Sequence, residues 1–413
     1  MTLPRSALVV GLARSGQAAA VALARHGVRV VGVDRRPELE VGRLAEAGVE
    51  VRLGTEDEEL VDAIELVIKS PGVPGAAPLV ARARRLGVPV WSELELGYRL
   101  LRGVELVAVT GTNGKTTTSE LLGVILDAPV AGNVGRALCE LDGVVSEGRV
   151  VCEVSSFQLE DIHDFRPRAA ALLNLEADHL DRHGTFEAYR EAKLRVFENQ
   201  GAADTAVVPR GFAPVPGAAR RIEFEASDPL PAEPRIPGVH NRENAAAATA
   251  VARALGVIDD EIARGLESFP GVSHRLELVR ETGGVRFVND SKATNVAAAL
   301  RGLAAYSDPL RLILGGSLKG ESFVPLAQAI RAHGGVRSIH LVGEASDELA
   351  AALESVAVEY ARARTLDSAV STAAALARPG DLVLLSPACA SFDAFKDFEE
   401  RGDRFREQVE ALS

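Results

Sequence analysis

The stretch Thr110-Gly111-Thr112-Asn113-Gly114-Lys115-Thr116-Thr117 decides the fold of this chain. An apolar run at residues 105–109 precedes it and predicts a buried strand, and residues 119–126 after it predict a helix. In a loop between a strand and a helix, glycines let backbone N–H groups close around phosphate oxygens. The lysine reaches the terminal phosphates, and the hydroxyl of Thr116 can bind Mg²⁺. We therefore expect ATP or GTP to bind here, the alternative being a glycine-rich turn without a ligand.

The loop is a shortened variant of the usual phosphate-binding pattern. In the pattern G-x-x-x-x-G-K-[ST] the first glycine would stand at position 109, where this chain has Val109. A lysine between a glycine and two threonines has no structural purpose in a tight turn. For this reason the loop is interpreted as phosphate-binding despite the missing glycine.

Length and composition indicate a globular protein of several domains. The chain has 413 residues, of which 47% are hydrophobic and 25% charged. At about 150 residues per domain, three domains are expected. No apolar run approaches the ~20 residues of a membrane span, no signal peptide opens the chain, and the three cysteines are scattered, so we expect a cytoplasmic protein. The net charge of −12 argues against nucleic acid as a partner.

Lysine is scarce in this chain, which uses arginine wherever a generic positive charge will serve. Only six of the 46 basic residues are lysines. The remaining lysines are expected where a compact or deprotonatable amine is required. Four of them are site candidates, and Lys69 and Lys396 are interpreted as ordinary. The four candidates are Lys115, Lys193, Lys292 and Lys319.

Alternating strand and helix patterns predict an α/β fold with three domains. A Rossmann-like domain is expected at residues 1–91, a central domain like a P-loop ATPase with a mostly parallel sheet at 92–271, and a second Rossmann-like domain at 272–413. The predicted strands are 7–10, 28–34, 49–53, 66–69 and 88–91 in the first domain, 105–109, 150–154 and 169–174 in the second, and 285–289, 310–314, 338–342 and 381–385 in the third.

The first domain opens with a turn similar to a dinucleotide-binding fingerprint. Its second glycine is replaced by Ala13, and bulky Arg14 follows, which disfavours NAD. A nucleotide could still lie on the helix N-terminus near Ser15, with Asp34 or Arg35 beside a base or ribose. An NAD-dependent oxidoreductase remains an alternative at this point. The loop at residues 70–73, after a predicted strand, is a second candidate for ligand binding.

Several polar groups follow strands of the second domain. Glu153 stands at the end of a predicted strand, placed like a second Mg²⁺ ligand opposite Thr116. Residues 174–183 bring His179 among acids, which indicates a metal or phosphate site, or else a solvated turn. Lys193 lies off the charged stripe of its helix, so a surface salt bridge is not its obvious role. Asn241 could simply cap a helix, which would leave Asn244 unexplained.

Three loops of the third domain also follow predicted strands. Residues 289–295 and 314–320 each carry one of the scarce lysines, and residues 386–393 end the last strand. Cys389 is interpreted as a small buried residue, because no activating histidine adjoins it. Strand-end loops of one domain together with a phosphate loop of another predict a cleft between domains.

Taken together, these motifs resemble those of the Mur ligase family over nearly the whole chain. Within that family, residues 155–160 and 386–393 are most similar to the branch that adds D-glutamate. The motifs that carry the resemblance are residues 110–117, 153–160, 178–182, 189–199, 240–244, 274–275, 289–295, 314–320 and 386–398.

The resemblance implies an ATP-dependent acid–D-amino-acid ligase of peptidoglycan and cell-wall synthesis. It would join D-glutamate to UDP-N-acetylmuramoyl-L-alanine through an acyl phosphate. ATP, two Mg²⁺ ions and a CO₂-derived carbamate on Lys193 are implied, in a monomer whose third domain closes on ATP. The alternatives are a sibling ligase with another acceptor, such as a folylpolyglutamate synthase, and a P-loop binding protein without turnover.

The resemblance also implies which residues form each site. Catalysis would fall to Lys115, Glu153, His179 and Lys193, and the metal ligands would be Thr116, Glu153, His179 and Lys193. ATP would contact Gly111, Thr112, Asn113, Gly114, Lys115, Thr116, Thr117, Asn241, Asn244, His274, Arg275, Asp290 and Lys292. The UDP-sugar would contact Ser15, Asp34, Arg35, Arg36, Ser70, Gly72 and Asn133. D-Glutamate would contact Thr294, Lys319, Ser391, Phe392 and Phe398.

Overall fold

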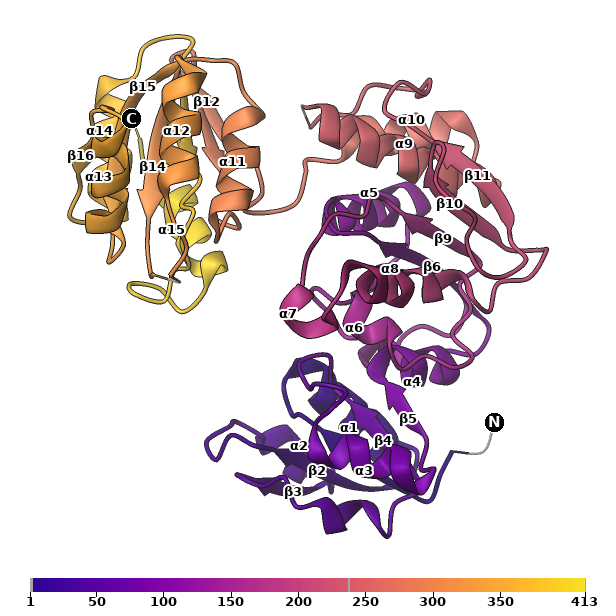
Figure 1. The fold of residues 1–413 in the computed structure, drawn as a ribbon. Coiled ribbons are helices and arrows are strands. Elements are labelled where there is room, and N and C mark those ends of the chain that lie inside the picture. Colours follow the sequence, from indigo (N-terminus) through magenta and orange to yellow (C-terminus); the bar gives the residue numbers. More distant parts are fainter. Residues whose placement is uncertain (1–2, 237, 319, 413) are drawn as a thin grey trace. The chain divides into compact units, whose positions relative to one another are not determined.

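The chain folds into two compact units, seen in a computed structural model that describes residues 3–236, 238–318 and 320–412. One unit comprises residues 1–234 and 239–269, and the other comprises residues 235–238 and 270–413. The first unit contains two sheets and the second contains one (Figure 1). Each sheet falls in one of the three predicted domain ranges, except that the last strand of the first sheet (Val90–Ser92) ends one residue beyond 91, and the α/β fold is confirmed. The boundaries at 91/92 and 271/272 stay predictions.

The first sheet has five parallel strands in the order β3-β2-β1-β4-β5. Alternate residues of β1 face opposite sides: Ala7 and Val9 pack with α1, whereas Leu8 and Val10 pack with α3. Helices therefore cover both faces, as parallel sheets require. The elements are β1 (Ser6–Val10), α1 (Arg14–Arg25), β2 (Arg29–Asp34), α2 (Gly42–Glu46), β3 (Glu50–Leu53), η1 (Glu58–Val61), β4 (Leu66–Lys69), α3 (Pro78–Leu86) and β5 (Val90–Ser92).

The second sheet has six strands in the order β11-β10-β9-β6-β8-β7, all paired in parallel. The helix after the phosphate loop begins at Lys115 rather than at 119, so the loop lies directly on the helix N-terminus. Its elements up to η2 are α4 (Glu93–Leu100), β6 (Val104–Thr110), α5 (Lys115–Leu126), β7 (Val130–Gly132) and η2 (Leu138–Leu141). The rest are β8 (Gly148–Glu153), α6 (Ser156–Leu159), β9 (Ala169–Leu172), α7 (Leu180–His183), α8 (Phe186–Leu194), η3 (Arg195–Phe197), β10 (Thr205–Pro209), β11 (Arg220–Phe224), α9 (Val239–Ala254) and α10 (Asp259–Ser268).

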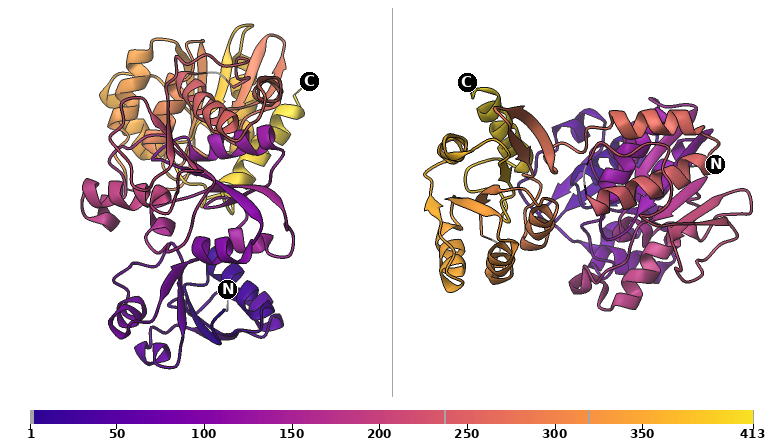
Figure 2. Two further views of the ribbon diagram at one scale, coloured as in Figure 1. Left: turned by 90° about the vertical axis from the view of Figure 1, so that its right-hand side faces the viewer. Right: turned by 90° about the horizontal axis from the view of Figure 1, so that it is seen from above.

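The third sheet has the order β12-β13-β17-β14-β15-β16, with β12 antiparallel to β13. It belongs to the orange and yellow part of the ribbon (Figures 1 and 2). Leu312 and Leu314 of β14 pack with α11, α12 and α13, whereas Ile313 packs with α14 and α15. The elements are β12 (Glu277–Thr282), β13 (Val285–Asn289), α11 (Val296–Ala304), β14 (Leu310–Gly315), α12 (Val324–His333), β15 (Val336–Val342), α13 (Ser346–Ser355), β16 (Ala361–Arg362), α14 (Leu366–Leu376), β17 (Leu382–Leu385) and α15 (Phe398–Glu410).

Three further expectations can be compared with the fold. Within the described residues, no helix has both the length and the apolar character needed to cross a bilayer. Cys389 is buried, as expected of a small core residue. The helix-capping interpretation of Asn241 is wrong, because α9 begins at Val239 and Asn241 lies inside its first turn.

Candidate active site

The phosphate loop joins β6 to α5, and its backbone conformation requires glycine at position 114. Gly114 has a φ of 82°, which is in the left-handed region. A Cβ atom there would lie 2.3 Å from Oδ1 of Asn244, so the residue must lack a side chain for α9 to approach the loop. Lys115 folds back over the loop, where its Nζ donates hydrogen bonds to the carbonyl oxygens of Gly111 and Thr112, both at 2.9 Å.

Residues after β9 hold the phosphate loop in place. The backbone N–H of Asn113 donates to Oδ1 of Asn174 at 2.8 Å, and its side-chain amide donates to Oε2 of Glu176 at 2.9 Å. The hydroxyl of Thr112 lies 2.9 Å from that of Tyr189 on α8. The loop is therefore fixed from two neighbouring segments before any ligand arrives.

Lys193 lies on α8 and points under the same loop. Its side chain is only 2% exposed, and its Nζ donates to the carbonyl oxygen of Gly111 at 2.8 Å. Burial, assisted by the nearby charge of Lys115, lowers the pKa of the Lys193 amine to about 7. At neutral pH a substantial fraction of this amine is uncharged, which is unusual for a lysine.

Glu153 ends β8, beside the phosphate loop on the adjacent strand. Its Oε1 accepts a hydrogen bond from the side-chain amide of Asn133 at 2.9 Å. Its Oε2 is buried and has no hydrogen-bond partner within the described part of the chain. A buried carboxylate oxygen without a partner is costly, and a metal ion is one group that would satisfy it.

His179 lies at the start of α7 in a left-handed conformation, with a φ of 51°. Its ring packs against that of Phe157, with the ring centroids 4.9 Å apart. The guanidinium of Arg182 also lies over the Phe157 ring, 4.7 Å from its centroid. His183 stacks on Phe157 at 5.3 Å. Nowhere in the described residues do three or more His, Cys, Asp or Glu side chains form a metal-binding group. A metal site here must therefore include other donors.

A cavity of about 440 Å³ opens at the carboxyl ends of β1, β2 and β4 in the first unit. All seven residues predicted to hold a UDP-sugar line it, together with thirteen others. The complete lining is Val10, Gly11, Ala13, Arg14, Ser15, Val33, Asp34, Arg35, Arg36, Thr55, Glu56, Ser70, Pro71, Gly72, Val73, Pro74, Ala77, Leu79, Asn133 and Gln158.

Asp34 does not present a free carboxylate to this cavity. Its Oδ2 accepts from the backbone N–H of Leu12 at 2.8 Å, and both oxygens accept from the guanidinium of Arg36 at 2.9–3.0 Å. The hydrogen bonds from Arg36 lower the pKa of Asp34 to about 2. Asp34 thus orients Arg36, and it is less suited to bind the ribose hydroxyls of NAD.

Gln158 lines the same cavity and was not among the predicted site residues. Its Oε1 accepts from the backbone N–H of Ser155 at 3.0 Å, as part of a capping box at the start of α6. Its Nε2 is buried and has no hydrogen-bond partner among the described residues. The spacing Ser155-x-x-Gln158 was a readable signal, because a capping box fixes the direction of the side chain.

The second unit brings together the predicted ATP-binding residues that it contains. Nδ1 of His274 lies 3.0 Å from the side-chain amide of Asn289, and its ring packs edge-on against Phe398. Asp290 accepts from the hydroxyl of Ser386 at 2.7 Å, and burial raises the pKa of its carboxyl to about 7, against the effect of the Arg275 charge. The amine of Lys292 lies 5.7 Å from the ring centroid of Phe398.

Three of the residues predicted to bind D-glutamate, Thr294, Ser391 and Phe392, occupy loops of the same unit, and Phe398 is the first residue of α15. Ser391 is buried, whereas Phe392 is 72% exposed. The backbone N–H of Thr294 donates to the carbonyl of Lys292 at 2.9 Å. Lys319 lies outside the described residues.

Arg401 connects these loops and was not predicted. Its buried guanidinium donates to the hydroxyl of Ser291 at 2.9 Å, to the carbonyl of Ala390 at 2.9 Å and to that of Cys389 at 3.1 Å. It therefore joins the segment after β13 to the segment after β17. No local pattern distinguishes this arginine from the many others in the sequence.

Comparisons with known proteins bear on this arrangement. Three family descriptions match the chain: "Mur ligase MurD-like, N-terminal domain" at residues 5–92, "Mur ligase middle domain" at 109–213 and "Mur ligase, glutamate ligase domain" at 274–389. The chain is 44% identical to a UDP-N-acetylmuramoylalanine--D-glutamate ligase of Geobacter metallireducens, over 99% of this chain and 98% of that protein. A protein of the same name from Myxococcus xanthus is 41% identical over 98% of both chains.

The chain belongs to the Mur ligase family. Solved structures agree with the fold of this Mur ligase. A UDP-N-acetylmuramate-alanine ligase of Thermotoga maritima superposes with a TM-score of 0.59 at 19% identity, covering 99% of this chain and all of that one. A MurF ligase of the same organism, solved in complex with ADP, gives a TM-score of 0.58 at 18% identity and covers 92% of this chain and 95% of that one.

Family membership bears on one of the interpretations left open by the sequence. An NAD-dependent oxidoreductase is not favoured, in agreement with the occupied carboxylate of Asp34. The donors of this Mur ligase fit Mg²⁺, which prefers oxygen ligands. Among the described residues, the buried Oε2 of Glu153 has no hydrogen-bond partner. Thr116 places a hydroxyl in the first turn of α5.

The sequence analysis interpreted Lys69 as an ordinary lysine, and the structure of this Mur ligase corrects that interpretation. Its side chain is fully buried and forms ion pairs with Glu160 and Asp161 at 2.5 and 2.8 Å. Scarcity of lysine was the signal that could have found it. The charged partners lie 91 residues or more away in the sequence, so no local pattern revealed them.

Proposed function

We propose that this Mur ligase joins D-glutamate to UDP-N-acetylmuramoyl-L-alanine at the expense of ATP, as a step of peptidoglycan precursor synthesis. The observation that carries the choice of D-glutamate is the similarity, over nearly the full length, to the D-glutamate ligases named above. The structure adds support, because a phosphate loop and a cavity of about 440 Å³ occur in the same compact unit. Action on ATP and a UDP-linked precursor accords with a cytoplasmic monomer, which we also propose.

The first unit would bind the phosphates of ATP and the UDP-sugar. In this proposal Lys115 and the loop N–H groups hold the phosphates, while Asn244 buttresses the loop. The seven predicted cavity residues and Gln158 hold the UDP-sugar, and the unpartnered Nε2 of Gln158 donates a hydrogen bond to it.

The chain's own groups suit two Mg²⁺ ions. Thr116 and Glu153 would bind one ion, and His179 with a carbamate on Lys193 would bind the other. The bound ions would offset the charge that develops on the transferring phosphoryl group. Only an uncharged amine reacts with CO₂, and the buried amine of Lys193 meets this requirement near neutral pH.

The second unit would supply the remaining ATP contacts and the amino acid. ATP would contact His274, Arg275, Asp290 and Lys292 there. D-Glutamate would contact Thr294, Ser391, Phe392, Phe398 and Lys319, since its two carboxylates require a cation and hydroxyl donors. Closing of this part of the chain on ATP stays a prediction.

The proposed reaction has two steps. The carboxylate of the L-alanyl group attacks the γ-phosphorus of ATP, which forms an acyl phosphate and releases ADP. The uncharged amine of D-glutamate then attacks the acyl carbon, and the resulting tetrahedral intermediate expels inorganic phosphate and loses the amine proton. An amide bond remains, at the cost of one ATP.

An assay of phosphate release tests the proposal directly. With ATP, Mg²⁺ and UDP-N-acetylmuramoyl-L-alanine present, we expect release with D-glutamate and none above background with L-glutamate or L-alanine. Activity with another amino acid alone would assign the chain to a sibling ligase. Tight binding of NADH without binding of ATP would instead revive the oxidoreductase interpretation.

A further inference from the structure

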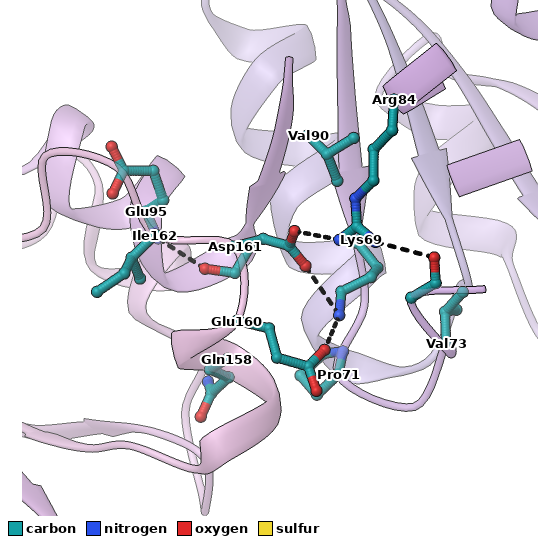
Figure 3. A network of polar contacts seen from close by, with 12 residues as sticks. Lys69, Pro71, Val73, Arg84, Val90, Glu95, Gln158, Glu160, Asp161 and Ile162 are labelled. Atoms are coloured by element: carbon teal, nitrogen blue, oxygen red, sulfur yellow. Dashed lines mark hydrogen bonds and ion pairs between the residues drawn. The ribbon is translucent and has the colours of Figure 1, made fainter. Parts of the chain in front are cut away.

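Lys69 is a buried cation whose place in the fold is not explained by the proposed reaction. It is the last residue of β4, and its ammonium group lies 2.5 Å from Oε2 of Glu160 and 2.8 Å from Oδ2 of Asp161 (Figure 3). Its side chain has no solvent exposure. Both carboxylates follow directly after α6, which lies in the chain between two strands of the second sheet. The contact therefore joins β4 of the first sheet to the end of α6.

The two segments joined by Lys69 both contribute to the lining of one cavity. Immediately after Lys69, residues 70–74 line the cavity of the first unit. Two residues before Glu160, the side chain of Gln158 lines the same cavity from α6. The ion pairs thus lie beside both segments.

Two arginines reinforce the same connection. Arg84 of α3 pairs with Oδ1 of Asp161 at 2.7 Å and also donates to the carbonyl of Gly75 at 3.0 Å (Figure 3). Arg182 donates to the carbonyl of Pro71 at 3.1 Å and to that of Val73. Lys69 differs from these partly exposed arginines in being wholly buried, so its ion pairs are screened least by water and salt.

We propose that Lys69 is a positioning residue for the nucleotide-sugar: through Glu160 and Asp161 it holds the 70–74 loop at a fixed distance from α6 and so sets the width of the cavity. This inference rests on the proposed function only in naming the ligand. Lys69 itself does not line the cavity, and it acts through the residues on either side of it.

Substitution of Lys69 by methionine tests the proposal, since methionine keeps the length and apolar stem but removes the charge. In Lys69→Met we expect KM for UDP-N-acetylmuramoyl-L-alanine and Kd for UDP, measured by calorimetry, to rise about tenfold. KM for ATP should change less than twofold, because the phosphate loop does not contact Lys69. Arg85→Met is the matched control. Arg85 lies on α3 and forms an exposed ion pair with Glu58 of η1, so its loss should leave all these constants unchanged.

A second variant separates positioning from plain destabilisation. Lys69→Met leaves the Glu160 carboxylate without its buried partner, which lowers Tm, and the double variant Lys69→Met/Glu160→Gln removes that charge. We expect the double variant to regain most of the lost Tm and to keep the raised KM and Kd. If KM and Kd of the double variant return to wild-type values, or if Lys69→Met binds UDP as wild type does, the proposal is overturned. If wild type itself does not bind UDP, the failure lies in the proposed function.

Discussion

Lys193 shows how burial can change the chemistry of a single side chain. The same amine that would be a surface cation elsewhere is enclosed beneath the phosphate loop, with its Nζ on the carbonyl of Gly111. Burial and the nearby Lys115 both disfavour the ammonium form, which is why the pKa is lowered to about 7. Arginine could not take this role, because its guanidinium stays protonated.

We expect Lys193→Arg to be inactive, because a permanent cation replaces a group that must become a carbamate. Lys193→Ala should lose at least about 100-fold in kcat and regain part of it when a short-chain carboxylate such as acetate is added, since the acid can occupy the vacated space. The measurement is phosphate release against carboxylate concentration. Glu191→Ala, on the exposed face of the same helix, is the control and should not respond. No rescue of Lys193→Ala by any small carboxylate would count against the carbamate.

At the residue scale, positions that depend on a short stretch of sequence could be predicted, whereas contacts between residues far apart in the sequence could not. The place of residues 110–117 between a strand and a helix, and that of Glu153 at the end of β8, agree with the sequence prediction, because each follows an apolar run that is recognisable as a strand. Lys69 and Arg401 were missed, because the significance of both comes from burial against groups far away in the chain. Lysine scarcity alone did not single out Lys69, which the sequence analysis interpreted as ordinary.

Among the elements, the phosphate loop and α5 depend on Gly114 at their junction. We expect Gly114→Ala to weaken ATP binding by at least about tenfold, because a Cβ would collide with Asn244 at 2.3 Å in addition to the cost of a φ of 82°. Calorimetric titration with ATP measures the effect.

Gly87→Ala is the control for Gly114→Ala, because Gly87 has a φ of 72° at the end of α3 but open space around its Cα. It should lower the free energy of unfolding by about 1 kcal/mol and leave ATP binding intact. Equal losses of ATP binding in both variants would mean that general destabilisation, and not the local collision with Asn244, causes the effect.

Several strands that the sequence pattern missed, among them β7, β12 and β16, are short or lie at sheet edges. β7 and β16 have three and two residues, too few for a periodic pattern to appear. β12 is antiparallel at the edge of the third sheet and only partly buried, so it lacks the continuous apolar run by which the central strands β13, β14 and β17 were recognised.

For the whole molecule, the division into two compact units has a consequence for ligand binding. All residues that line the cavity belong to the first unit. A ligand that binds only in this cavity raises the free energy of unfolding of the unit that binds it. The increase depends on the free concentration of the ligand relative to its Kd. The second unit gains nothing directly from such a ligand.

Hydrogen exchange on the full chain measures this consequence. With UDP-N-acetylmuramoyl-L-alanine at about 100 times Kd, amides of the first sheet that exchange only through unfolding of the first unit should slow about 100-fold. Amides of β13, β14 and β17 should keep their rates, and CMP at the same concentration is the control for non-specific nucleotide effects. D-Glutamate should produce the reverse pattern, with slowing confined to residues 270–412. Equal slowing of both units by the UDP-sugar would show that they unfold together, whereas slowing of the second unit alone would place the UDP-sugar outside the cavity that Lys69 helps to form.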